Sequence, residues 1–227
     1  MYNTRKTATI LGILFLVVMA SWTLSFVLTE QVVNAPKYLE NVFPNRFKIF
    51  IGAMFELIDI AAIIGIVVIM YSLMKRHNER MSIWYASFRI LESILLVIAV
   101  ICTLSLITLS EQYLKSGNTN SQYFEVIGSL LFAYKNQWFY FLLPFFYSAA
   151  AFVFYYFFLK SRLIPTFISV IVIVAAILIL IGIPLDMIEF KPGKFIGIIG
   201  GLNEIILGIW LIVKGFHSSA AIQYIKD

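Results

Sequence analysis

Long apolar stretches alternate with short polar connections along almost the whole chain. A helix that rises about 1.5 Å per residue needs about 20 apolar residues to cross a hydrocarbon core about 30 Å thick. Six stretches meet or approach that length, at residues 10–29, 49–74, 83–109, 138–159, 166–185 and 195–213. The pattern predicts an all-α, polytopic integral membrane protein whose residues 1–227 form one domain, a bundle of six transmembrane helices.

A shorter apolar pattern lies between the third and fourth stretches. Phe124 and Ile127 recur at helical spacing opposite Gln122 and Glu125. The segment is too short to cross a membrane. It is typical of a helix that lies in the plane of the headgroups, and we expect a short interfacial helix near 121–135.

Composition strengthens the membrane assignment. Apolar residues make up 61% of the chain and charged residues 13%, whereas soluble domains average about 45–50% and about 25%. These values exclude a soluble globule and a disordered segment. The net charge is +5, but the Lys and Arg residues are spread over short connections, so we expect membrane lipid and no nucleic acid as a partner.

The distribution of Lys and Arg predicts the orientation. Six spans would place both termini on one side, and that side carries ten Lys and Arg residues against seven on the other. Positively charged connections favour the cytoplasm, so both termini are expected to be cytoplasmic. The first apolar run continues to Leu28, which favours a retained anchor over a cleaved leader that would end near Ala20.

Five charged residues, one of them next to an asparagine, lie inside the predicted spans, where a charged side chain costs about 2.5 to 3.5 kcal/mol on insertion scales. They are Glu56 and Asp59 in the second span, Arg89 and Glu92 in the third, and Glu204, next to Asn203, in the sixth. The rise per residue places the acids of all three spans near the midplane, and residues three apart share one helix face. We therefore expect these six residues to form a midplane polar cluster and a candidate binding site.

The charges of this cluster do not balance. Four carboxylates face one guanidinium, and an excess of negative charge is untenable in a medium of low polarity. The excess favours a protein that binds or moves a small cation, a proton or a cationic amphiphile. Two alternatives remain open: an intramembrane enzyme that acts on a lipid or polyprenyl substrate, with Arg89 on a phosphate, and a purely structural accessory subunit.

The fourth span supplies a predicted secondary wall to the site. Tyr140, Ser148 and Tyr155 lie near one side of that span, and its aromatic rings could attract an organic cation or simply fill the core. His77 and His217 stand in polar connections and Cys102 has no second cysteine. No zinc site and no cofactor are expected from this set.

Four blocks in order carry a resemblance: ELIDIAAIIGIVVIMYSLMKRHNE, FRILESILLV, SRLIPTFISV and LNEIILGIWLIVKGF. They resemble the bacterial integral-membrane family designated domain of unknown function 4386, over about residues 10–216. The resemblance implies a bacterial cytoplasmic-membrane protein of about six helices and implies no catalytic residue. The polar residues lie inside the matching blocks, although Asp59 stands where the family pattern has Asn.

Overall fold

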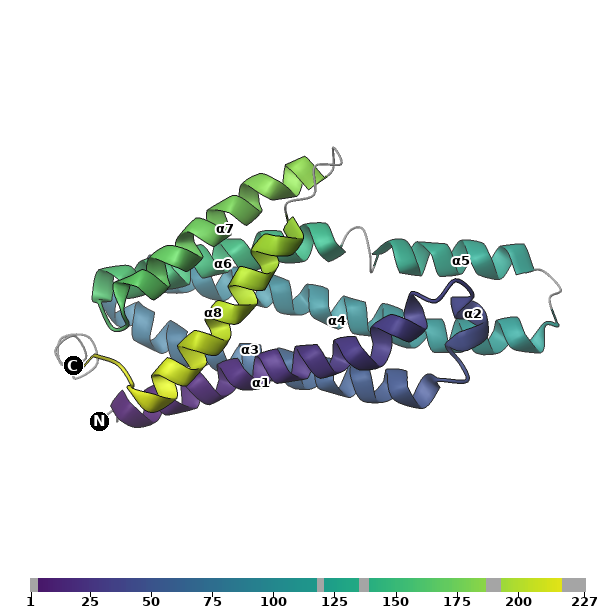
Figure 1. The fold of residues 1–227 in the computed structure, drawn as a ribbon, viewed down its shortest axis with the longest axis horizontal. Coiled ribbons are helices and arrows are strands. Elements are labelled where there is room, and N and C mark those ends of the chain that lie inside the picture. The colour runs from purple at the N-terminus through teal and green to yellow at the C-terminus, as the bar shows by residue number, and fades with distance from the viewer. Residues whose placement is uncertain (1–3, 118–120, 135–138, 187–192, 218–227) are drawn as a thin grey trace. The chain divides into compact units, whose positions relative to one another are not determined.

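Helices form all the regular structure in the part of the chain that is described, residues 4–117, 121–134, 139–186 and 193–217 of a computed structural model (Figure 1). In chain order they are α1 (Thr4–Val33), α2 (Tyr38–Asn41), α3 (Arg46–His77), α4 (Glu79–Lys115), α5 (Ser121–Ala133), α6 (Phe139–Ser161), α7 (Thr166–Asp186) and α8 (Gly193–Val213). The predicted all-α class is confirmed. Within these ranges, helices α1, α3, α4 and α6 are long and apolar enough to cross a membrane.

Local signals explain where the long helices end. Asn78 separates α3 from α4, because its side-chain Oδ1 accepts a hydrogen bond from the Met81 amide at 3.1 Å and caps the new helix. α6 ends at Ser161, and Arg162 follows with a φ of +53°, the left-handed conformation that commonly closes a helix. Pro165 then precedes the first residue of α7.

The helices group into two compact units. The first unit comprises Met1–Met19, Ala61–Ser93 and Leu143–Asp227, and the second comprises Ala20–Ile60 and Ile94–Leu142. Helices α1, α3 and α4 contribute residues to both units. The organisation of the whole chain as a single bundle stays a prediction.

Aromatic rings fill the core of the first unit. The ring of Phe154 on α6 lies 5.8 Å from that of Phe15 on α1, 5.5 Å from that of Tyr85 on α4 and 4.8 Å from that of Phe158. These distances are typical of edge and tilted aromatic pairs. Phe154 therefore joins three helices at one point.

Two kinds of contact join α1 to α8 within the first unit. Gly12 and Gly208 bring the two backbones together so closely that a Cβ atom added to Gly12 would lie 2.6 Å from the Gly208 carbonyl oxygen. At the end of α8, the Arg5 guanidinium donates hydrogen bonds to the carbonyl oxygens of Ile212, at 2.8 Å, and Val213, at 2.9 Å. The first turn of α1 thus satisfies the last carbonyls of α8.

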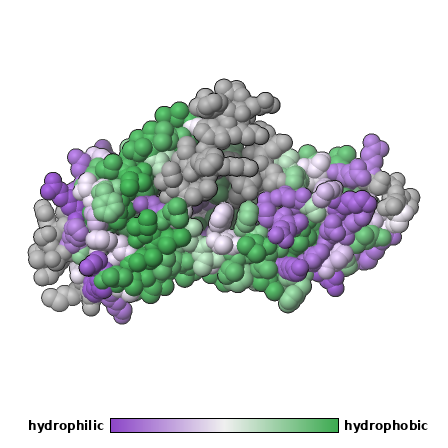
Figure 2. All heavy atoms as spheres, viewed as in Figure 1, coloured by the Kyte–Doolittle hydropathy of each residue, from purple (hydrophilic) through white to green (hydrophobic). Residues whose placement is uncertain are grey.

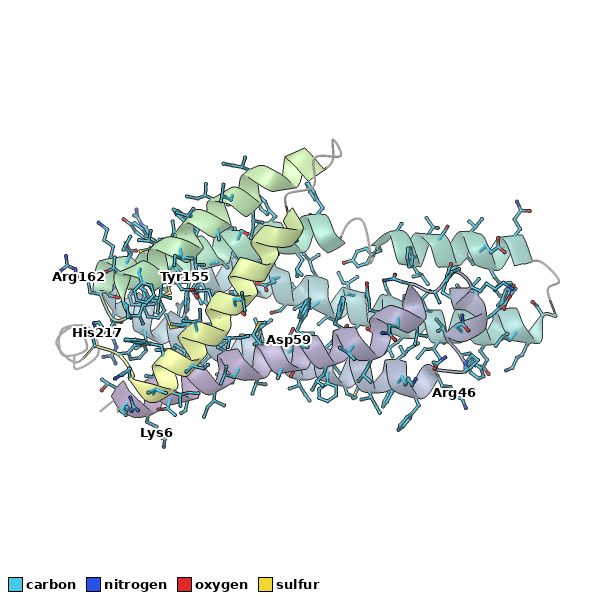
Figure 3. All side chains as sticks on the ribbon, viewed as in Figure 1. Lys6, Arg46, Asp59, Tyr155, Arg162 and His217 are labelled. Atoms are coloured by element: carbon cyan, nitrogen blue, oxygen red, sulfur yellow. The ribbon has the colours of Figure 1, made fainter. Side chains whose placement is uncertain are left out.

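The same end of the first unit collects the other helix junctions. The His217 amide donates to the Leu163 carbonyl at 2.9 Å, and the His77 ring lies 5.9 Å from that of Phe157. Figure 3 shows Lys6, Arg162 and His217 toward this end. We call it the basic end, and its exposed Lys and Arg residues are Arg5, Lys6, Lys75, Arg76, Arg80, Lys160, Arg162 and Lys214.

The outer surface of the first unit is apolar between its ends. Figure 2 shows hydrophobic side chains over α7 and α8 and hydrophilic ones at the basic end. The exposed apolar residues are Phe167, Val170, Ile171, Val174, Ile177, Leu178 and Ile181 on α7 and Leu202, Ile206, Ile209 and Val213 on α8. Such a continuous exposed surface is typical of contact with lipid.

The second unit has a core of its own, formed by Val33, Val42, Ile49 and Leu106. Helix α5 packs beside this core and occupies the segment predicted for a short helix. Its exposed face is also apolar, and Tyr123, Val126 and Leu130 are at least 55% exposed. α5 is therefore apolar both on the face that packs against the core and on its exposed face.

The close approach of Gly12 to Gly208 generates a prediction. Gly12→Ala should lower the free energy of unfolding by about 1 to 3 kcal/mol, because the new methyl group meets a backbone carbonyl that cannot rotate away. The control is Gly65→Ala, whose Cβ would meet the flexible side chain of Leu14 at 3.2 Å. Denaturant titration in mixed micelles should give an unchanged or slightly higher stability for Gly65→Ala, and equal losses in both variants would contradict the prediction.

Candidate functional site

Four of the six predicted cluster residues lie in the first unit and are buried. Arg89 and Glu92 are on α4, Asn203 and Glu204 are on α8, and none of the four is more than 7% exposed. Tyr147 and Tyr155 on α6 complete the set that we call the polar network. Figure 3 labels Tyr155 within this part of the molecule.

The α4 part of the network is an ion pair. Arg89 Nη1 donates to both carboxylate oxygens of Glu92, at 3.1 Å to Oε1 and 2.9 Å to Oε2. The two residues are three apart, so the helix itself brings their side chains together. Arg89 Nε is buried and has no hydrogen-bond partner among the described residues.

The α8 part of the network binds α6 at two points. The Tyr147 hydroxyl donates to Glu204 Oε1 at 2.9 Å, and Asn203 Nδ2 donates to the Tyr155 hydroxyl at 3.0 Å. Two consecutive residues of α8 thus each engage one tyrosine of α6. Because unsatisfied polar groups are expensive in a medium of low polarity, these bonds hold the two helices in one register.

Tyr147 connects the two parts. The Arg89 guanidinium carbon lies 5.9 Å from the centroid of the Tyr147 ring, within the range of a cation-π interaction. Glu204 also interacts electrostatically with Arg89 and Glu92. The ion pair of α4 and the tyrosine-bonded carboxyl of α8 therefore belong to one site.

The formal charges of this network do not cancel. Arg89 contributes one positive charge, while Glu92 and Glu204 each contribute a negative charge when ionised, which leaves an excess of one negative charge. Tyr147 and Asn203 are neutral. A buried carboxylate in excess takes up a proton or a cation, since an uncompensated charge in the interior is strongly unfavourable.

The remaining predicted residues lie elsewhere or make other contacts. Glu56 and Asp59 belong to the second unit, where Glu56 Oε1 accepts a hydrogen bond from the Ser25 hydroxyl at 2.9 Å and Asp59 is 3% exposed. The convergence of these two acids with the polar network stays a prediction.

The predicted secondary wall is divided between the units. Tyr140 falls in the second unit. The buried Ser148 hydroxyl of the first unit has no hydrogen-bond partner among the described residues.

Tyr147 was predicted only as one of the aromatic rings of the fourth span that could attract a cation, and its hydrogen bond to Glu204 was not predicted. Its pairing with Glu204 joins positions 57 residues apart in the chain, which no local spacing indicates. One signal could have found it. A buried carboxyl requires a donor, and Tyr147 is one of the few side chains of the fourth apolar stretch that can donate.

Metal-binding side chains do not gather in the part of the chain that is described. Those residues contain no group of three or more His, Cys, Asp and Glu side chains that could hold a metal ion. His77 and His217 are exposed in the first unit, and Cys102 is half-buried in the second.

One family model matches the chain. It covers residues 10–215 and is described as Domain of unknown function (DUF4386). Comparison with curated proteins and with solved structures finds no match.

The ion pair of α4 can be tested by removing one partner or both. Arg89→Met should destabilise the protein by about 3 to 5 kcal/mol, because it leaves buried carboxyls without their cation. The double variant Arg89→Met with Glu92→Leu should recover most of that loss, since it removes both charges and keeps the volume apolar. Thermal unfolding in detergent measures both, and a double variant that is no more stable than Arg89→Met would contradict the ion-pair account.

Proposed function

The chain belongs to this family of domains of unknown function, and we propose that it is a multi-pass membrane protein that binds a proton or another small cation at Glu204. One observation carries the proposal. Glu204 is 7% exposed and its Oε1 is bonded to a neutral phenol, while the guanidinium of Arg89 is hydrogen-bonded to Glu92. The site is thereby one positive charge short of neutrality.

A proton would neutralise the excess negative charge of the site with the fewest ligand atoms. It needs a single oxygen, which Glu204 supplies, and the protonated carboxyl can still accept the Tyr147 hydrogen bond through its other lone pairs. A metal ion would require several converging oxygen ligands. The charged and titratable groups around Glu204 are Tyr85, Arg89 and Glu92 on α4 and the hydroxyls of Tyr147 and Tyr155 on α6.

Depth in the membrane is the second support for the proposal. Arg89 lies ten residues from the start of α4 and Glu204 nine residues from the end of α8. At about 1.5 Å per residue, both stand about 14 to 15 Å from the basic end, near the middle of a hydrocarbon core about 30 Å thick. A titratable group at that depth is a functional candidate by default.

The proposal includes six spans. α7 and α8 are each 21 residues long, a length of about 30 Å at the helical rise, which supports counting them as spans beside α1, α3, α4 and α6. α5 has 13 residues, about 20 Å, which suits a helix lying at the interface.

Orientation and location follow from the basic end. Arg5 binds the last carbonyls of α8, so the start of α1 and the end of α8 lie at one end of the first unit, which supports placing both on one side of the membrane. That end carries the exposed Lys and Arg residues, which favour the cytoplasmic face. We propose that the protein lies in a bacterial cytoplasmic membrane with both termini in the cytoplasm.

Infrared difference spectroscopy of the full-length protein in lipid nanodiscs tests proton binding. A pH step should produce a protonated-carboxyl C=O band that is absent from Glu204→Gln. Gln keeps an oxygen that accepts the Tyr147 hydrogen bond, so this variant should stay folded. The matched control is Glu56→Gln, which removes the carboxyl bonded to Ser25 in the second unit and should leave the Glu204 band in place. A band that survives in Glu204→Gln would refute the proposal and favour a purely structural network.

Cysteine accessibility tests the orientation. The chain has one cysteine, Cys102, so Cys102→Ser gives a background free of thiols. Single additions of His77→Cys and Lys214→Cys should react with a membrane-impermeant maleimide only from the cytoplasmic side, and Ser116→Cys only from the opposite side. Labelling of positions 77 and 214 from opposite sides would contradict the arrangement of spans.

A further inference from the structure

We propose that the basic end of the first unit is a binding site for the headgroups of anionic phospholipids. This inference is independent of proton binding at Glu204, because it concerns a different part of the molecule. It rests on three observations: a concentration of positive charge, a strained arginine at the centre of a rigid turn, and apolar side chains directly beside the charges.

Contacts between helix ends bring the positively charged residues together. The start of α1, the α3–α4 and α6–α7 junctions and the end of α8 meet there, through Arg5 on Ile212 and Val213 and through His217 on Leu163. Eight exposed Lys and Arg residues gather at this end of the first unit. Among the described residues of that end the acid is Glu79, which pairs with Lys75 at 3.1 Å. The surface therefore carries a strong excess of positive charge.

Arg162 occupies an unusual backbone position in this surface. Its φ of +53° is the left-handed region, where a side chain other than that of Gly or Asn is unfavourable. The turn around it is rigid, because Leu163 and Ile164 are at most 1% exposed and the Leu163 carbonyl accepts the His217 amide. Gly usually takes this position after a helix, so the arginine here is kept at a cost in stability. The buried neighbours thus hold the backbone from which the exposed Arg162 side chain extends.

Apolar side chains next to the charges identify the ligand as a lipid. Trp84 is 60% exposed one turn after Arg80, and Phe167 is 59% exposed in the first turn of α7. Val213 is 60% exposed directly before Lys214. The positive groups therefore stand at the boundary between apolar surface and water, which is where lipid phosphates lie. A soluble phosphate or an acidic protein would not require these apolar neighbours.

Lys160 shows how such a side chain reaches the headgroups. Its ammonium group lies 5.7 Å from the ring centroid of Tyr156, which is itself exposed. Long basic side chains extend along apolar surface in this way and keep the charge at the interface. Lys160, Arg162 and Lys214 then offer three cations from two connected helix ends.

Native mass spectrometry of the full-length protein, released from nanodiscs, tests the site. Phosphatidylglycerol should remain bound in preference to phosphatidylcholine. The triple variant Lys160→Gln, Arg162→Gln and Lys214→Gln should weaken phosphatidylglycerol binding by roughly five-fold for each charge removed. The matched control, Lys37→Gln, Lys48→Gln and Lys115→Gln, removes the same charge from the second unit and should leave that binding unchanged.

A second variant separates lipid binding from folding. Arg162→Gly relieves the left-handed strain, so its Tm should be at or above that of the unmodified protein while phosphatidylglycerol binding falls. Arg162→Lys should retain part of the binding. Equal losses in the triple variant and its control, equal retention of both lipids, or displacement of phosphatidylglycerol by inorganic phosphate at similar concentration would each overturn the proposal.

Discussion

A buried charged group must be neutralised by its neighbours, and this requirement relates α4, α6 and α8 to one another. Arg89 lies against both oxygens of Glu92, and Glu204 receives the hydroxyl of Tyr147. The hydrogen bonds of this network join α6 to α8, and its ion pair lies on α4. Its unequal charges also make it the place where a proton or cation would change the electrostatic balance.

Close backbone packing supports that network. Gly208 lies one turn from Glu204 on the same face of α8, and its contact with Gly12 holds this part of α8 against α1. Larger residues at either glycine would separate the two helices. The position of Glu204 therefore depends on these small residues as well as on hydrogen bonds.

The cost of placing charge in an apolar medium also explains the surface of the first unit. Exposed side chains of α7 and α8 are apolar between the helix ends, whereas Lys and Arg residues collect where the helices begin and end. The buried network and the basic end are separated by about 14 to 15 Å along α4 and α8. The neutralised charges of the polar network and the exposed charges of the basic end are therefore separate features of the first unit.

The sequence by itself determined the helical class and the approximate position of each long helix, because apolar length is a local property. The predicted stretches 166–185 and 195–213 correspond to α7 (Thr166–Asp186) and α8 (Gly193–Val213), whereas α4 begins earlier than its apolar stretch because Asn78 caps it. Spacing also indicated the Arg89–Glu92 pair, since residues three apart share a helix face. Only the tertiary structure decided that Glu204 meets Tyr147 and that Asn203 meets Tyr155, over 57 and 48 residues. The physical reason is that sequence periodicity fixes which residues share a face of one helix but leaves open how each helix is rotated against its neighbours.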